Sequence, residues 1–179
     1  MIKITEDHIK WLAAQYGYDY PAVKAIIEVE SGGIGFAPDG KLIIQFEPVW
    51  FKRKTHYAPS GLWSVNGIER QSKEWEAFNS AFAIDANAAM ESTSIGMMQI
   101  MGLHWKELGF DNVGEMWDFA KISEANQLEL ALKFIQYNEK LEYGLLTKNW
   151  QAVAYYYNGA KYKMNNYDVK LENAYKKYV

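Results

Sequence analysis

The sequence predicts an α+β fold that is mostly α-helical, with a small β-hairpin or sheet inserted after its second helix. Apolar residues recur with helical spacing along most of the 179 residues. The pattern changes between residues 34 and 46, where Pro38-Asp39-Gly40 is a turn signal and Lys41–Phe46 is the best strand candidate. The chain has no fixed-period repeat, low-complexity tract or linker-like stretch. We therefore predict a single domain over residues 1–179, with a small β lobe at about residues 34–50.

The first two helices are bounded by capping residues. Thr5 can cap a helix that Gly17 ends, because glycine readily adopts the left-handed conformation of a C-cap. Asp19 can cap the second helix, with Pro21 near its first turn, where a missing N–H costs nothing. Ser31-Gly32-Gly33 ends this second helix and leads into the β segment.

Helical spacing returns after the β segment. The predicted helices cover Trp75–Phe82, Ala86–Glu91, Ser94–Met101, Asn112–Ala120, a long segment beginning at Ser123, Trp150–Asn158, and a final segment around Leu171–Tyr178. The turn-rich segment from Thr55 to Glu69 is left without an assignment.

The composition excludes several classes of partner and cofactor. The formal charge of −3 is modest and no basic stripe is present, so we expect no nucleic-acid partner. The absence of cysteine excludes disulfides and thiolate zinc sites. His8, His56 and His104 are scattered and lack metal-ligand spacing, so we expect no metal and no cofactor.

No segment of the sequence resembles a membrane or secretion signal. No apolar run approaches the roughly 20 residues needed to span a bilayer, and the N-terminus has no apolar secretory region. We therefore expect a protein that is synthesised in the cytoplasm and does not insert into membranes. Nothing in the sequence argues against a monomer, which is the oligomeric state that we expect.

Glu30 is the first candidate catalytic residue. Val23, Ile26, Ile27 and Glu30 follow at i, i+3, i+4 and i+7, so Glu30 lies on the apolar face, whereas Glu28 points towards solvent. Burial and the negative end of the helix dipole both disfavour the anion and raise its pKa, as a general acid near neutral pH requires. The structural alternative is a glutamate at the edge of the stripe that pairs with a Lys or Arg.

A second carboxylate is harder to choose. Glycosidases normally use two carboxyl groups. Glu47 is the first candidate, since it ends the strand that follows the Glu30 helix and both residues could face one cleft. A salt bridge or a hairpin-edge charge explains Glu47 equally well. Glu91, just before the Ser92-Thr93-Ser94 turn, is the reserve candidate.

Three stretches in order resemble one superfamily. Val29–Gly33 resembles the catalytic segment of lysozyme-superfamily muramidases and lytic transglycosylases, in which a helix ends in Glu-Ser. Ser94–Gly102 resembles their Ser-x-Gly-x-x-Gln-Ile-Met motif, and Ala154–Gly159 resembles their Ala-x-x-Tyr-Asn-Gly segment. More narrowly, Phe46-Glu47 and Ala89–Ser94 resemble the N-acetylmuramidase family of phage endolysins, and the resemblance extends over nearly the whole chain.

The resemblance implies a lysozyme-like fold and a role for each matching residue. Glu30 is implied to protonate the glycosidic oxygen, and Ser94 and Gln99 to line the sugar site. Tyr157 and Asn158 are implied to lie beside the scissile bond, where they steer the substrate or a water.

These observations predict a peptidoglycan-degrading glycoside hydrolase of the lysozyme or N-acetylmuramidase kind. We expect it to cut the β-1,4 bond between N-acetylmuramic acid and N-acetylglucosamine as a phage endolysin, and to reach the cell wall after release from the host cytoplasm. A lytic transglycosylase that yields 1,6-anhydro-muramic acid is the nearest alternative. A non-catalytic wall-binding or virion structural protein is the alternative from another class.

Overall fold

The computed structural model describes residues 2–31, 33–57 and 70–179. The helices are α1 (Glu6–Tyr16), α2 (Tyr20–Ser31), α3 (Pro48–Thr55), α4 (Gln71–Ile84), α5 (Ala86–Glu91), α6 (Val113–Ile122), α7 (Glu124–Tyr137), α8 (Glu139–Leu146), α9 (Trp150–Asn158) and α10 (Tyr167–Lys176), with 3-10 turns η1 (Gly102–His104) and η2 (Tyr162–Asn165). The strands are β1 (Ile44–Phe46), β2 (Thr93–Ile95) and β3 (Ile100–Met101). The predicted α+β class is confirmed.

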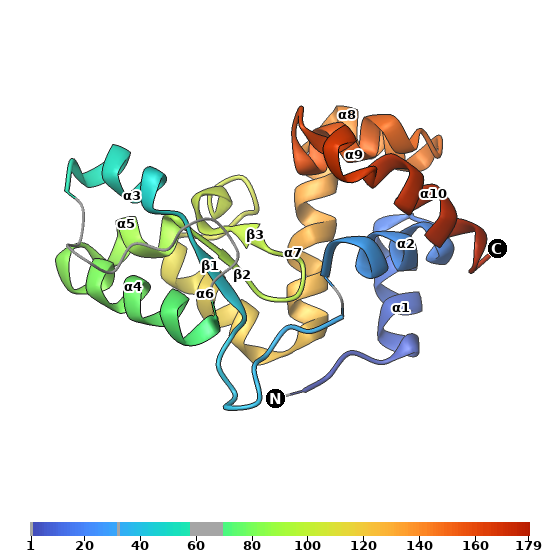
Figure 1. Cartoon of the computed structure of the whole chain (residues 1–179). Helices are drawn as coiled ribbons and strands as arrows, with labels where there is room; N and C mark the ends of the chain where they lie inside the picture. The colour runs from blue at the N-terminus through green and yellow to red at the C-terminus, as the bar shows by residue number, and fades with distance from the viewer. Residues whose placement is uncertain (1, 32, 58–69) are drawn as a thin grey trace.

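Figure 1 shows two groups of elements on either side of α7. Helices α1, α2, α8, α9 and α10 gather on one side, and α3, α4, α5, α6 and the sheet on the other. Helix α10 packs along α2 and against α9, so the end of the chain lies beside its second helix. Within the described residues, none of the helices is both long and apolar enough to cross a membrane.

The predicted helix boundaries are largely confirmed, because they rest on local capping. The Thr5 side chain accepts a hydrogen bond from the His8 N–H, and Gly17 closes α1 with φ 73°. The Asn112 and Ser123 side chains cap α6 and α7 as expected. Helix α8, by contrast, was not predicted from the sequence.

The predicted helix over Ser94–Met101 is wrong. This segment forms β2, a four-residue turn and β3, in an antiparallel sheet of order β1-β2-β3. Gly96 and Gln99 adopt left-handed φ values of 72° and 51°, which a continuous helix does not allow. Ile95 and Ile100 face each other across the turn, where apolar β-branched side chains favour a strand.

The predicted β lobe at residues 34–50 is partly corrected. The turn at Pro38-Asp39-Gly40 is present, closed by a bridge between Phe36 and Leu42, and the strand follows at β1. Residues 48–55 are helix α3, however, because Pro48 occupies the first turn of a helix with its φ already fixed. The other two strands of the sheet come from residues 93–101. Most of the unassigned segment from Thr55 to Glu69 lies outside the described residues.

Two buried side chains at the start of α7 join the loops from both groups of elements. Glu124 accepts the N–H of Gly35 at 3.1 Å, and Gln127 accepts the N–H of Met97 at 2.7 Å. A Cβ on Gly35 would lie 2.0 Å from the Gln127 side chain, so only glycine permits this approach. The loop after α2 and the β2–β3 turn are thereby held to one helix.

Candidate active site

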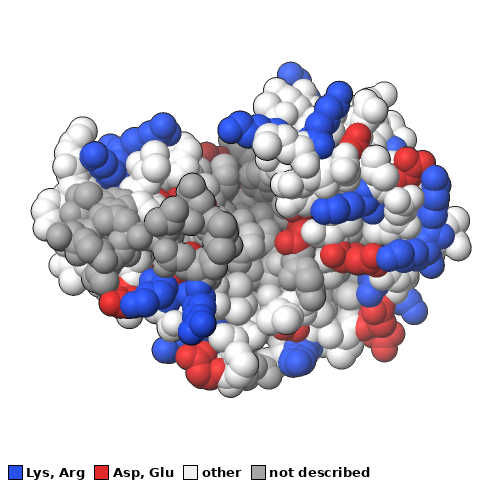
Figure 2. Space-filling view, in the orientation of Figure 1, with Lys and Arg blue, Asp and Glu red and all other residues white. Residues whose placement is uncertain are grey.

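A hollow separates the two groups of elements on the face shown in Figure 2. In the shared view of Figures 1 and 2, the end of α2 lies on one side of this hollow and the junction of β1 with α3 on the other. Lys and Arg side chains lie on both sides of the hollow (Figure 2). The predicted catalytic residues Glu30 and Glu47 come from these two segments.

Glu30 lies in the last turn of α2 and is partly buried. Val23, Ile26 and Ile27 on the same helical face are buried, as the spacing predicted. The Asn158 amide donates a hydrogen bond to Glu30 Oε1 at 2.8 Å. Burial raises the pKa of Glu30 from 4.5 to about 7, although the Asn158 hydrogen bond and the Lys170 charge act against this shift. Glu30 forms no salt bridge with any other described residue.

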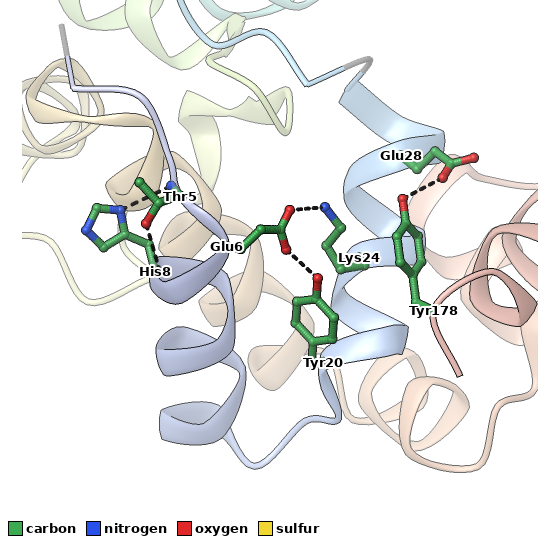
Figure 3. Close-up of polar contacts among 7 residues, drawn as sticks. All are labelled: Thr5, Glu6, His8, Tyr20, Lys24, Glu28 and Tyr178. Carbon is green, nitrogen blue, oxygen red and sulfur yellow. Dashed lines mark hydrogen bonds and ion pairs between the residues drawn. The ribbon is translucent and has the colours of Figure 1, made fainter.

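The other face of α2 is fixed by polar contacts with α1 and the end of the chain (Figure 3). Glu6 accepts hydrogen bonds from Lys24, at 2.7 Å, and from the Tyr20 hydroxyl. The exposed Glu28 accepts a hydrogen bond from the Tyr178 hydroxyl at 2.9 Å. The two glutamates of α2 therefore differ as predicted, with Glu28 at the surface and Glu30 against the interior.

Tyr157 and Asn158 lie at the end of α9, close to Glu30, and the role implied for them beside the scissile bond stays a prediction. Asn158 makes the direct contact, and Tyr157 donates its hydroxyl hydrogen to the Met98 carbonyl at 3.2 Å. Burial, with a smaller effect of the Glu30 charge, raises the pKa of Tyr157 well above 10, so its phenol stays protonated. Tyr157 thereby ties the β2–β3 turn to the surroundings of Glu30.

Two residues of α10 were missed by the sequence analysis. Tyr167 and Lys170 lie close enough to Glu30 for charge effects: Glu30 helps to raise the pKa of Tyr167, after burial, and Lys170 lowers that of Glu30. Their spacing of three residues, which places both on one face of a helix, was the only available signal. The contact of α10 with α2 depends on packing between distant segments, which local periodicity does not reveal.

Ser94 and Gln99 hold the β2–β3 turn. Ser94 is buried in the central strand, with Gln45 and Met101 opposite it in the two neighbouring strands. The Gln99 side chain donates to the Gly96 carbonyl at 2.8 Å, so its amide stabilises the turn itself. The sugar-binding role implied for these two residues stays a prediction.

Glu47 lies at the junction of β1 and α3, where it is the N-cap residue of α3 without a side-chain capping bond. The Gln45 side-chain amide donates a hydrogen bond to the Glu47 carboxylate at 3.0 Å, and the backbone N–H of Glu47 donates to the Ser92 carbonyl. Burial, followed by the charge of Glu74, raises the pKa of Glu47. Among the described residues, no hydrogen bond or ion pair joins Glu47 to Glu30.

The reserve candidate, Glu91, makes contacts that hold neighbouring elements together. Its carboxylate accepts hydrogen bonds from Lys54 at 2.5 Å and from the Trp105 indole at 2.8 Å, and so links α5 to α3 and to the residue after η1. Across the described part of the chain, no cluster of three or more His, Cys, Asp or Glu side chains could hold a metal ion.

A helical fold with a small sheet, and a hollow beside a helix end whose buried carboxyl group has its pKa raised to about 7, is an arrangement that suits a glycoside hydrolase. Residues 19–179 match the profile of the N-acetylmuramidase family. The crystal structure of the Burkholderia AP3 phage endolysin is similar, with a TM-score of 0.88 and 37% sequence identity over 98% of this chain and 70% of that chain. No curated protein sequence gives a significant match. The chain belongs to the N-acetylmuramidase family and is a glycoside hydrolase that degrades peptidoglycan.

Proposed function

We propose that the enzyme cleaves the β-1,4 bond between N-acetylmuramic acid and N-acetylglucosamine, with Glu30 as its general acid. The observation that carries this proposal is the pKa of Glu30, raised to about 7 by burial in the last turn of α2. A carboxylic acid with this pKa is still protonated in weakly acidic and near-neutral solution, so it has a proton to donate. Similarity to a phage endolysin supports the further proposal that this chain also acts as an endolysin.

In the proposed reaction, the Glu30 carboxyl proton passes to the glycosidic oxygen as the bond from that oxygen to the anomeric carbon breaks. The leaving sugar departs as an alcohol, and the sugar left behind passes through an oxocarbenium-like state. The Asn158 amide then donates its hydrogen bond to the carboxylate that Glu30 has become. A water adds to the anomeric carbon and returns its proton to a carboxylate, which completes hydrolysis.

The second group in this reaction is Glu47 or a water held by neighbouring polar side chains. Glu47 supports the proposal through its place at the junction of β1 and α3 and its partial burial. A lytic transglycosylase needs no second carboxylate, because the muramic acid C6 hydroxyl attacks instead of water. Within the described residues, no hydrogen bond or ion pair joins Glu47 to Glu30 or Asn158, which favours this second candidate.

Mass spectrometry of soluble fragments from purified peptidoglycan tests the proposal, with wild type and Glu30→Gln compared side by side. We expect reducing-end muramic acid from wild type only. Anhydro-muramic acid from wild type only would retain Glu30 as the acid but replace hydrolysis by transglycosylation. Equal products from the two proteins would exclude Glu30 as the catalyst.

A further inference from the structure

Lys170 differs from the other lysine within α10 in its partners. Lys176 forms a salt bridge with Glu172 at 2.6 Å. Lys170 is exposed and forms no salt bridge with any other residue that the structure describes. Its ammonium lies instead over the ring of Tyr167, 5.3 Å from the ring centroid. Cation–π contacts of this kind hold a lysine in place without neutralising its charge.

The helix that carries Lys170 packs against the helix that carries the candidate acid, and the Lys170 charge lowers the pKa of Glu30. Helix α10 packs along α2 and against α9, the two helices that carry Glu30 and Asn158 (Figure 1). Lysines elsewhere on α2 and at the end of α10 have carboxylate partners: Lys24 bonds to Glu6, as Figure 3 shows, and Lys177 bonds to Glu28. Lys170 therefore presents a cation whose attraction is still available to a ligand at the site.

The proposed substrate supplies a matching group. Every muramic acid residue carries a lactyl ether, whose carboxyl group either is free or continues into a stem peptide with free carboxylates of its own. Chitin has the same β-1,4 linkage and N-acetyl groups but carries no carboxylate. A lysine beside the acid can therefore distinguish the two polymers by charge, provided that the ammonium reaches the carboxylate.

We propose that Lys170 is a specificity-determining residue, whose ammonium, held over the Tyr167 ring on α10, binds a carboxylate of the substrate and favours peptidoglycan over neutral glycans. This inference rests on the proposed function, because it requires a muramic acid polymer in the site. The carboxylate comes either from the lactyl group or from the stem peptide, and the two sources are separable by experiment.

The test compares initial rates of wild type, Lys170→Met and Lys170→Arg, with Lys176→Met as the matched control on the same helix. Three forms of one peptidoglycan preparation are used: intact, with all carboxyl groups converted to amides, and stripped of its peptides so that the lactyl carboxylates are free. The assays run at about pH 5.5, where substrate carboxylates are ionised and Glu30 is protonated in every variant. Circular dichroism and thermal unfolding confirm that each variant is folded.

We expect Lys170→Met to raise KM on intact peptidoglycan about tenfold, with kcat nearly unchanged, since a hydrogen bond to a charged group is lost. Lys170→Arg and Lys176→Met should remain within about twofold of wild type. On amidated peptidoglycan, the KM of wild type should rise to that of Lys170→Met. The KM of Lys170→Met should be the same on amidated and intact material. A defect that is larger on the stripped glycan, where every lactyl carboxylate is free, assigns the lactyl group, and a defect confined to the intact wall assigns the stem peptide.

The inference would be overturned if Lys170→Met raised KM above that of wild type by the same factor on intact and on amidated material. Lys170 would then not act through a substrate carboxylate. Activity of Lys170→Met equal to that of wild type on every substrate would overturn it as well. These outcomes are distinct from failure of the proposed function, in which wild type itself releases no muramic acid products from intact peptidoglycan.

Discussion

The two candidate carboxyl groups, Glu30 and Glu47, are both partly buried but differ in the groups that surround them. Burial raises the pKa of both. The next influence on Glu30 is a neutral amide hydrogen bond from Asn158, which favours the anion, whereas the next influence on Glu47 is the negative charge of Glu74, which disfavours it.

The two helices add a second contrast. Glu30 is in the last turn of α2, at the negative end of the helix dipole, and Glu47 is the N-cap residue of α3, at the positive end. The dipole of α2 therefore favours a protonated Glu30, and that of α3 favours an ionised Glu47. The dipoles alone would leave Glu30 protonated and Glu47 ionised, whereas burial and the charge of Glu74 act against ionisation of Glu47.

The largest expected effect follows replacement of the acid. Glu30→Gln keeps an acceptor for Asn158 but removes the transferable proton, so activity on peptidoglycan should fall about a thousandfold. Glu28→Gln is the matched control on the same helix and should retain activity within about twofold, since its contacts are at the surface. A Glu30→Gln enzyme with substantial activity would contradict the assignment.

The same variant should change how stability depends on pH. The unfolded chain releases the Glu30 proton near pH 4.5, whereas the folded chain holds it to about pH 7. Wild type therefore loses stability between these two values as pH rises, and Glu30→Gln does not. Urea denaturation at pH 5 and about pH 8 should show a gain for the variant at the higher pH, on the order of 1–2 kcal/mol.

The next effect concerns Glu47. Glu47→Gln should lower activity roughly tenfold to a hundredfold if its charge supports the transition state or activates a water. Fragment analysis should accompany the rate measurement. Full activity together with anhydro-muramic acid products would remove Glu47 from the mechanism and favour transglycosylation.

Asn158 should have a smaller effect with a distinctive pH signature. Its amide stabilises the carboxylate that Glu30 becomes, so Asn158→Ala should lower the rate about tenfold. Loss of this hydrogen bond also raises the pKa of Glu30 further. Activity declines when the acid is deprotonated, so the alkaline limb of the pH–rate profile should lie near pH 7 in wild type and higher in Asn158→Ala. An alkaline limb at lower pH in the variant would contradict this account.

The last prediction concerns the stability of the β2–β3 turn, where we expect the smallest effect on the reaction itself. Gly96 has a φ of 72°, and an added Cβ would lie 2.7 Å from the Gln127 side chain. Gly96→Ala should therefore destabilise the protein by about 2–3 kcal/mol in urea denaturation. Gly109→Ala is the control, because Gly109 has a φ of 85° but an added Cβ would meet no atom within 4 Å. Gly109→Ala should lower the free energy of unfolding by about 1 kcal/mol. An equal decrease for the two variants would show that contact with Gln127 does not matter.

The features predicted from sequence are those that local patterns determine. The caps at Thr5 and Ser123 bound helices because their side chains bond to nearby backbone N–H groups. Glu30 was placed correctly on the apolar face of its helix because the helical period is local. Its contact with Asn158 was not predicted, because periodicity does not reveal it and the family resemblance implied only that both residues act at the scissile bond.

The features that were missed depend on left-handed residues or on contacts between distant segments. Gly96 and Gln99 turn the chain between β2 and β3, and a Ser-initiated run of apolar residues gave no sign of that turn. Lys170 reaches the neighbourhood of Glu30 only because α10 packs on α2. The first miss concerns a local turn and the second concerns packing between distant segments, and helical periodicity reveals neither.

The most direct test of the central claim is a titration of the Glu30 side-chain carboxyl carbon by NMR, assigned by its absence in Glu30→Gln. We predict a midpoint near pH 7, well above that of an ordinary glutamate. A midpoint near 4.5 would show that Glu30 is ionised at neutral pH, and would contradict its role as the general acid.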